Sequence, residues 1–236
     1  MADRPLIILF VKDPARGRVK SRLASALGED ATLGLYRSFV LDILDTLGQT
    51  GIPVRICYYP PDSGKAVAEW LGPERQYLPQ EGRDVGERME NAFRQAFSGG
   101  ISRAVLIGSD IPDLPALFLN EAMASLLTHD AVIGPAHDGG YYLIGFRNDT
   151  FSPAAFSGIA WSTGTVLSST MQAFGRAGQR VHVLSPWRDV DTREDLKDLA
   201  ARNRRSAFSS SRTMSFLAGI KDILFSSEVS DDTIRL

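Results

Sequence analysis

The chain has 236 residues, enough for one globular domain that buries a large core without disulfide or metal staples. Its formal net charge is −2, with acidic and basic residues interspersed, which excludes the global positive field typical of nucleic-acid-binding proteins, so any anion site must be local. The single cysteine, Cys57, excludes an internal disulfide framework and fits a reducing compartment.

The first apolar run, residues 6–11, follows Asp3 and Arg4. It is too short to span a membrane and lacks a small-residue cleavage site. These features predict a cytoplasmic protein without a membrane span.

Apolar runs rich in branched side chains alternate with helical periods along the first half of the chain. Residues 6–11, 54–59 and 104–108 indicate buried strands of a mostly parallel sheet. Strands that alternate with helices predict a three-layer α/β/α domain. The helical stripes are Leu35, Phe39, Ile43 and Leu47, followed by Val85, Met89, Ala92, Phe93 and Ala96.

The same alternation continues to about residue 205. A helix is expected to open at Thr192, which is followed by acidic residues in the first turn. We expect one domain over residues 1–205 and a C-terminal extension of the same domain over 206–236, with a helix at 212–225 and a polar end. The other elements expected after residue 110 are helices at 115–127 and 163–177 and strands at 131–134, 141–146 and 181–184.

A basic loop directly follows the first predicted strand. Such a loop leads from the carboxyl end of a strand into a helix, whose free N–H groups favour an anion, and Lys and Arg add charge-assisted bonds to phosphate oxygens. Pro14 and Gly17 are expected to shape the turn, and the alternative is a solvated basic loop. No Walker A or dinucleotide glycine motif is present. The cations of the loop are Lys12, Arg16, Arg18, Lys20 and Arg22.

Asp110 follows the third predicted strand, at the sheet edge expected to carry the basic loop. A hard Mg²⁺ or Mn²⁺ ion held there by one or two carboxylates would bridge phosphate oxygens. Ser109 is a candidate nucleotide contact beside it. The alternative for Asp110 is a cap or turn residue, and Asp113 is expected to cap the following helix.

Paired glycines follow Asp138 and lead into the strand that carries Tyr141 and Tyr142. Gly139 and Gly140 would let the backbone approach a ligand closely. A tyrosine would stack on a sugar or base, and Asp138 would accept a sugar hydroxyl or act as a base. The alternative is a glycine-rich hairpin turn with ordinary core tyrosines.

Two carboxylates, Asp189 and Asp191, precede the helix that opens at Thr192. We expect Asp191 to complete a metal pair with Asp110, while Asp189 faces away through the alternation of an extended segment. The alternative is that Asp191 or Thr192 only caps the helix.

Glycines and charges also precede the helix that starts near Val85. Gly86, Glu87 and Arg88 are candidate nucleotide contacts that would line a base or sugar pocket. Equally, Asp84 and Glu87 would form only a capping box.

The order of these motifs resembles the bacterial glycosyltransferase-A-like family of nucleotide-diphospho-sugar transferases over about residues 6–200. A wider similarity reaches nucleotidyltransferases that act on molybdenum-cofactor precursors and on phospholactate. The resemblance implies a nucleotide-binding, metal-using fold with a mixed sheet between helices. It rests on residues 10–23, 86–89, 108–112, 138–145, 161–163 and 189–192.

The chain departs from this family in one respect. Typical glycosyltransferases of the fold hold the metal with an Asp-x-Asp triplet, whereas Gly108, Ser109 and Asp110 keep only the last carboxylate. This difference favours nucleotidyl transfer to a modest degree.

The expected activity is metal-dependent glycosyl transfer from a nucleotide sugar to a small-molecule acceptor. Asp110, Lys20 and Asp138 are the candidate catalytic residues, and Lys12, Lys20 and Arg22 would stabilise charge on the leaving group. The first alternative is a nucleotidyltransferase that uses a nucleoside triphosphate, activates a small phosphorylated acceptor and releases pyrophosphate. The second is a non-catalytic nucleotide-binding protein.

Overall fold

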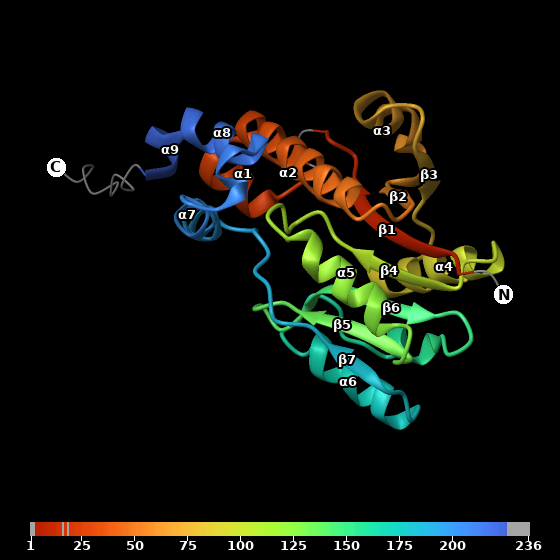
Figure 1. Cartoon of the computed structure of the whole chain (residues 1–236). Helices are drawn as coiled ribbons and strands as arrows, with labels where there is room; N and C mark the ends of the chain where they lie inside the picture. Colours follow the sequence, from red (N-terminus) through yellow and green to blue (C-terminus); the bar gives the residue numbers. More distant parts are fainter. Residues whose placement is uncertain (1–2, 16, 18, 226–236) are drawn as a thin grey trace.

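The computed structural model describes residues 3–15, 17 and 19–225, and it contains one seven-stranded mixed sheet (Figure 1). The strand order is β3-β2-β1-β4-β6-β5-β7. Each strand predicted from an apolar run is present, with ends shifted by at most one residue; β3 is additional. The strands are β1 (Pro5–Lys12), β2 (Val54–Tyr59), β3 (Gln76–Pro79), β4 (Arg103–Ile107), β5 (Ala131–Pro135), β6 (Tyr141–Arg147) and β7 (Val181–Val183).

Strand direction determines which loops meet. Strands β1 to β4 pair in parallel, with Leu9 opposite Ile107 and Lys12 opposite Tyr59. Strand β6 runs antiparallel to both β4 and β5. The loops that follow β1 and β4 therefore leave the sheet at the same edge, as the sequence predicts.

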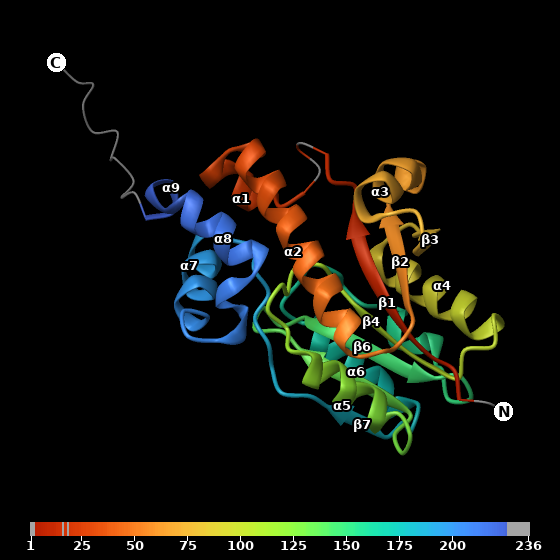
Figure 2. The ribbon, with the colours of Figure 1, turned by 45° about the horizontal axis from the view of Figure 1, so that its top comes forward.

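Helices cover both faces of the sheet (Figure 2). Helices α2, α3 and α5 pack on one face, and α4 and α6 pack on the other. This arrangement confirms the predicted three-layer architecture. The helices are α1 (Ser21–Leu27), α2 (Glu29–Gln49), α3 (Gly64–Leu71), α4 (Val85–Ser98), α5 (Ala116–Ser125), α6 (Val166–Arg176), α7 (Arg193–Arg202), α8 (Arg212–Gly219) and α9 (Lys221–Phe225).

The alternation of β1 divides the main core into its two halves. Ile7, Leu9 and Val11 face α2, whereas Leu6 and Ile8 face α4. All five are at most 2% exposed, so β1 is a central strand buried on both faces.

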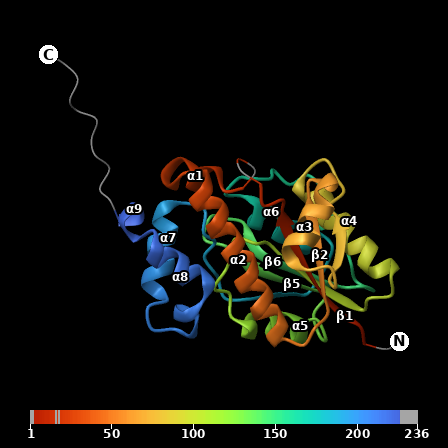
Figure 3. The ribbon, with the colours of Figure 1, turned by 90° about the horizontal axis from the view of Figure 1, so that it is seen from above.

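The C-terminal helices α7, α8 and α9 lie beside α1 and α2 (Figure 3). Asp42 of α2 is buried and accepts hydrogen bonds from the amides of Arg212 and Thr213, which satisfies the N-terminus of α8. The extension therefore packs on the same body as the sheet. The single helix expected over 212–225 is interrupted at Ile220, and residues 226–236 lie outside the described residues.

The sequence patterns do not predict two of the elements. Helix α3 has eight residues and strand β3 has four, both too short for periodicity to identify. No helix in the described part of the chain is long and apolar enough to cross a membrane.

Candidate functional site

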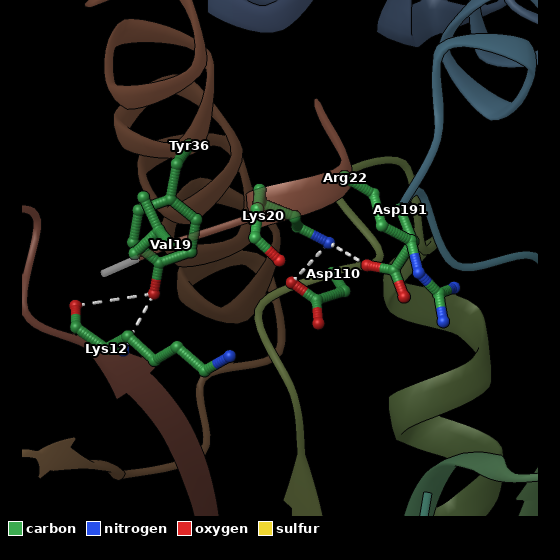
Figure 4. A pocket seen from close by; sticks show the side chains of 8 residues that line it. Lys12, Val19, Lys20, Arg22, Tyr36, Asp110 and Asp191 are labelled. Carbon is green, nitrogen blue, oxygen red and sulfur yellow. Dashed lines mark hydrogen bonds and ion pairs between the residues drawn. The ribbon is translucent and has the colours of Figure 1, made fainter. Parts of the chain in front are cut away.

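The centre of the site is the ammonium group of Lys20 (Figure 4). Its Nζ lies 2.7 Å from Oδ1 of Asp110 and 2.6 Å from Oδ1 of Asp191. It also donates to the carbonyl oxygen of Val190 at 2.5 Å. The structure thus brings together the predicted basic loop and both predicted metal ligands.

Local backbone structure fixes these three residues. Lys20 is the N-cap of α1 and has left-handed dihedral angles, φ 50° and ψ 53°. The amide of Val190 donates to the carbonyl oxygen of Asp110 at 2.8 Å, which joins the segment before α7 to the loop after β4. Thr192 and Asp195 form a full capping box at the start of α7, as predicted, so the Asp191 carboxylate is not used as the cap.

A polar pocket of 180 Å³ surrounds this cluster. The side chains of Asp110 and Asp191 are 42% and 40% exposed, and Lys12 and Arg22 are also exposed. The pocket therefore presents cations and carboxylates to solvent in one space. Its lining residues are Lys12, Val19, Lys20, Ser21, Arg22, Tyr36, Asp110 and Asp191.

Tyr36 anchors the end of β1 beneath the pocket. Its hydroxyl oxygen accepts a hydrogen bond from the Lys12 amide at 2.7 Å and lies 3.2 Å from the hydroxyl of Ser109. Burial raises the pKa of Tyr36, so the phenol stays neutral. Sequence reasoning missed Tyr36 because it sits within the apolar stripe of α2 and resembles any core aromatic.

Ser109 does not line this pocket, contrary to its assignment as a nucleotide contact. The residue is 6% exposed, and its hydroxyl faces Tyr36. It serves instead to join the loop after β4 to α2.

The charges within the cluster stabilise one another. Burial by itself lowers the pKa of Lys20, but the carboxylates of Asp110 and Asp191 outweigh this effect and raise it. Burial opposes ionisation of Asp191, yet Lys20, Arg22 and Lys12 lower its pKa. Lys20 and Asp191 are therefore both charged at neutral pH.

The prediction that Asp189 faces away from Asp191 is wrong. Residues two apart in an extended segment point to the same side, and it is Val190 between them that points into the core, with 0% exposure. Burial raises the pKa of Asp189 to about 6, and the nearby carboxylates of Asp138 and Asp191 add to this shift. Asp189 therefore belongs to the acidic side of the site.

The glycine turn at Asp138 is pinned to the start of α6. Oδ1 of Asp138 accepts a hydrogen bond from the Gly140 amide at 2.8 Å, and the Gly139 carbonyl accepts one from Leu167 at 2.9 Å. Gly139 has φ +88°, and a Cβ there would lie 2.3 Å from the carbonyl oxygen of Gly164. The turn therefore holds the exposed Asp138 carboxylate in a fixed place.

Replacing Gly139 by alanine is expected to destabilise the fold more than the same change at Gly178. Both glycines have a left-handed φ, but the Cβ added at Gly178 meets nothing within 4 Å. The control should cost about 1–2 kcal/mol of unfolding free energy for its backbone conformation, and Gly139→Ala should cost clearly more. Urea unfolding measures both, and equal losses would contradict a tight contact with Gly164.

The two tyrosines of β6 point to opposite faces of the sheet. Tyr142 is 5% exposed and donates to the Ser185 carbonyl at 3.0 Å, so its prediction as a stacking residue for a sugar is wrong. Tyr141 is partly buried among the aromatic core beside α4, with its hydroxyl 3.8 Å from Sδ of Met89. Both follow the alternative reading, ordinary core tyrosines of a strand buried on both faces.

The start of α4 forms a separate feature outside the pocket lining. Asp84 caps the helix by accepting from the Glu87 amide at 2.9 Å, while Glu87 pairs with Arg83. Gly86 permits the indole of Trp161 to pack on the helix, because a Cβ at Gly86 would lie 2.3 Å from that ring.

Arg88 stacks on a neighbouring aromatic ring instead of reaching the pocket. Its guanidinium carbon lies 3.7 Å from the ring centroid of Tyr59, and its Nε donates to the Gly82 carbonyl. The start of α4 thus lies near the carboxyl end of β2. The roles of Gly86, Glu87 and Arg88 as nucleotide contacts stay predictions.

Asp113 does not cap α5, whose N-cap is Pro115. Its side chain is 2% exposed and receives both Nε and Nη2 of Arg202, at 2.8 and 3.0 Å. It also accepts from Asn203 at 2.7 Å and from the Trp187 indole at 3.2 Å. Asp113 therefore ties the loop that carries Asp110 to both ends of the segment that carries Asp191.

Two residues predicted to shape the basic loop do so. Gly17 has φ +71°, which favours glycine, and Pro14 is buried with its carbonyl 3.5 Å from the Arg37 guanidinium. Arg16 and Arg18 lie outside the described residues.

The donor set at Asp110 and Asp191 fits a hard divalent ion held mainly by its substrate. Two partly exposed carboxylates supply oxygen ligands, and Mg²⁺ commonly takes one or two carboxylates and completes its shell with phosphate and water. The described residues contain no group of three or more His, Cys, Asp or Glu side chains able to hold a metal. A self-sufficient protein cage for the metal is therefore not present in this part of the chain.

The sequence matches, over residues 43–163, the family described as "Uncharacterized protein conserved in bacteria (DUF2064)". No curated protein matches the chain. A solved structure described as a "putative nucleotide-diphospho-sugar transferase" from Desulfovibrio desulfuricans is 42% identical, with a TM-score of 0.91, over 94% of this chain and 97% of that chain.

More distant solved structures share the fold. A cytidylyltransferase from Leptospira borgpetersenii is 14% identical, with a TM-score of 0.56, over 96% of this chain and 99% of that chain. A CMP:2-keto-3-deoxy-manno-octonic acid synthetase complexed with CTP is 11% identical, with a TM-score of 0.55, over 85% of this chain and 98% of that chain. The sheet and its helices therefore have the nucleotide-diphospho-sugar transferase fold.

Proposed function

The chain belongs to the DUF2064 family, and we propose that this member is a metal-dependent transferase that binds the phosphates of a nucleotide sugar and transfers its glycosyl group. The observation that carries the proposal is the meeting of Lys12, Lys20 and Arg22 with Asp110 and Asp191 around one pocket. Cations and carboxylates together suit a phosphate group that arrives with a divalent ion.

The position of the pocket agrees with this use. It lies beyond the carboxyl ends of β1 and β4, where α/β sheets bind ligands. With a volume of 180 Å³, it suits the phosphate portion of a donor. The base and sugar would extend over the neighbouring loops, including the turn at Asp138 and the start of α4.

Catalysis would rest on positioning and electrostatics. Lys12 and Arg22 stand exposed at the pocket and would pair with the diphosphate as it leaves the sugar. Asp110 and Asp191 would hold Mg²⁺ or Mn²⁺, which would neutralise phosphate charge. Asp138, exposed and held by its turn, is the candidate acceptor contact or base.

Nucleotidyl transfer is the second candidate, and one feature of the site favours it. The loop after β4 offers a single carboxylate to the pocket, because Gly108 stands where the glycosyltransferase triplet has its first aspartate. The hydroxyl of Ser109, at the middle position, is engaged with Tyr36. In this reaction, an acceptor oxygen would attack the α-phosphorus of a nucleoside triphosphate, and pyrophosphate would leave from the same pocket.

Product analysis distinguishes the candidates. A panel of nucleoside triphosphates and nucleotide sugars is first screened by calorimetry with and without Mg²⁺ or Mn²⁺, and donors that bind are then incubated with phosphorylated and unphosphorylated small acceptors. Glycosyl transfer releases a nucleoside diphosphate from a nucleotide sugar, whereas nucleotidyl transfer releases pyrophosphate from a triphosphate. Tight metal-dependent binding with no product would instead indicate a binding protein, and no binding by any donor would refute the nucleotide site.

A further inference from the structure

All three N–H donors of the Lys20 ammonium are already used within the protein. They face the carbonyl oxygen of Val190 and one carboxylate oxygen each of Asp110 and Asp191, between 2.5 and 2.7 Å away. The side chain is only 4% exposed. A phosphate oxygen can therefore pair with this ammonium only if one of these contacts is first broken.

The backbone of Lys20 is unusual for a lysine. Lys20 and Ser162 are the only described residues other than glycine with a positive φ. A left-handed lysine costs free energy that a glycine would not, and such a conformation persists when surrounding contacts over-determine it. The contacts to Asp110, Asp191 and Val190 are those that hold the side chain of Lys20 in place.

The ammonium stands where a divalent ion would stand. Asp110 and Asp191 are the two carboxylates suited to a metal, and a single cation already joins one oxygen of each. A divalent ion bound to the same oxygens would lie within a few ångströms of a buried positive charge, and like charges at such range repel strongly. With the Lys20 ammonium in place, the net negative charge that attracts the ion is one unit smaller than that of the two carboxylates alone.

We propose that Lys20 is a built-in cation that competes with the divalent metal for Asp110 and Asp191, so that metal binds tightly only together with a phosphate-bearing donor. The proposal rests on the metal assignment made under the proposed function. A donor's phosphates supply the missing negative charge, since they pair with the released Lys20 ammonium and with the metal at once. Metal and donor therefore bind with positive coupling.

The test measures Mn²⁺ binding to the nucleotide-free chain by electron paramagnetic resonance. We expect weak binding by the wild type and about tenfold tighter binding by Lys20→Met, because the two carboxylates regain their full charge. Lys12→Met is the matched control, since it removes the same charge from the same pocket without touching the carboxylates. Equal or weaker binding by Lys20→Met, or an equal gain in Lys12→Met, overturns the proposal.

Two further variants distinguish a change in Mn²⁺ affinity from a folding defect. Lys20→Gly suits the left-handed backbone and also removes the ammonium, so it should match Lys20→Met in Mn²⁺ affinity. Lys20→Met combined with Asp110→Asn should lose the gained affinity. Retained tight binding in this double variant would place the Mn²⁺ elsewhere and overturn the proposal.

The wild-type chain allows a second measurement. The Lys20 amine should resist acetylation in the free chain, and saturating Mn²⁺ should raise its labelling relative to Lys12, as read by mass spectrometry. Unchanged Lys20 labelling under saturating Mn²⁺ refutes the displacement.

Failure of the proposed metal site and failure of the proposed competition give different results. If metal-dependent nucleotide binding is lost in Asp110→Asn but Lys20→Met binds Mn²⁺ no better than the wild type, the site stands and only the competition is wrong. If Asp110→Asn leaves that binding unchanged, the proposed metal site fails first.

Discussion

Replacing Asp110 by asparagine is expected to abolish metal-dependent nucleotide binding, with a loss of about 100-fold or more in affinity. The amide keeps the shape of the carboxylate but removes the negative charge that attracts the ion. Stability should change little, by roughly 1 kcal/mol, because the Asp110 side chain is 42% exposed and Lys20 retains Asp191 and the Val190 carbonyl. Calorimetry with and without Mg²⁺, combined with thermal unfolding, measures both effects.

A matched control separates the local effect from a change in net charge. Asp62 is exposed in the short helix after β2 and does not line the pocket, so Asp62→Asn should leave nucleotide affinity unchanged. Unchanged nucleotide binding in Asp110→Asn, or the same loss in both variants, would refute Asp110 as a metal ligand.

Replacing Asp113 by alanine is expected to cause the largest loss of stability, about 3–5 kcal/mol of unfolding free energy. The carboxylate is 2% exposed and accepts hydrogen bonds from Arg202, Asn203 and Trp187. Removing it takes the acceptor from the Trp187 indole and from Nε of Arg202, while Arg202 keeps Asp198 and Asn203 keeps the Leu199 carbonyl. Donors that lose their acceptor in a buried place cost more than the net value of the bonds themselves. Equilibrium urea unfolding gives the difference.

Asp198→Ala is the control for this network, because Asp198 pairs with the same arginine but is 43% exposed. It should cost under about 1 kcal/mol. A similar loss in the two variants would mean that burial of Asp113 does not matter. Since Asp113 joins the loop of Asp110 to the segment of Asp191, ligand affinity should fall in Asp113→Ala even under conditions where the chain stays folded.

Strong local patterns predicted most of the sheet and the long helices. The run 6–11 is apolar throughout because the strand is covered on both faces, and the four-residue recurrence of Leu35, Phe39, Ile43 and Leu47 defines α2. Short elements with few apolar positions, such as β3, carry no comparable signal.

The candidate site was likewise predicted only in part. The basic loop after β1 and Asp110 after β4 were predicted to meet because parallel strands end at one edge, and they do meet. The tyrosine pair was misassigned because glycines before a strand look alike whether its side chains face a ligand or a core. Only the depth of packing around Tyr142 distinguishes these cases.

By itself, the sequence determined the order of strands and helices, the layered fold and the edge where charges gather, because these depend on local periodicity and strand direction. The tertiary structure alone decided how those charges pair. Lys20 and Asp191 are 171 residues apart and Asp113 and Arg202 are 89 apart, so no local pattern links them. It is the packing of α7 against α1 and α2 that brings Asp191 to Lys20, and the buried ion pair at Asp113 holds it there.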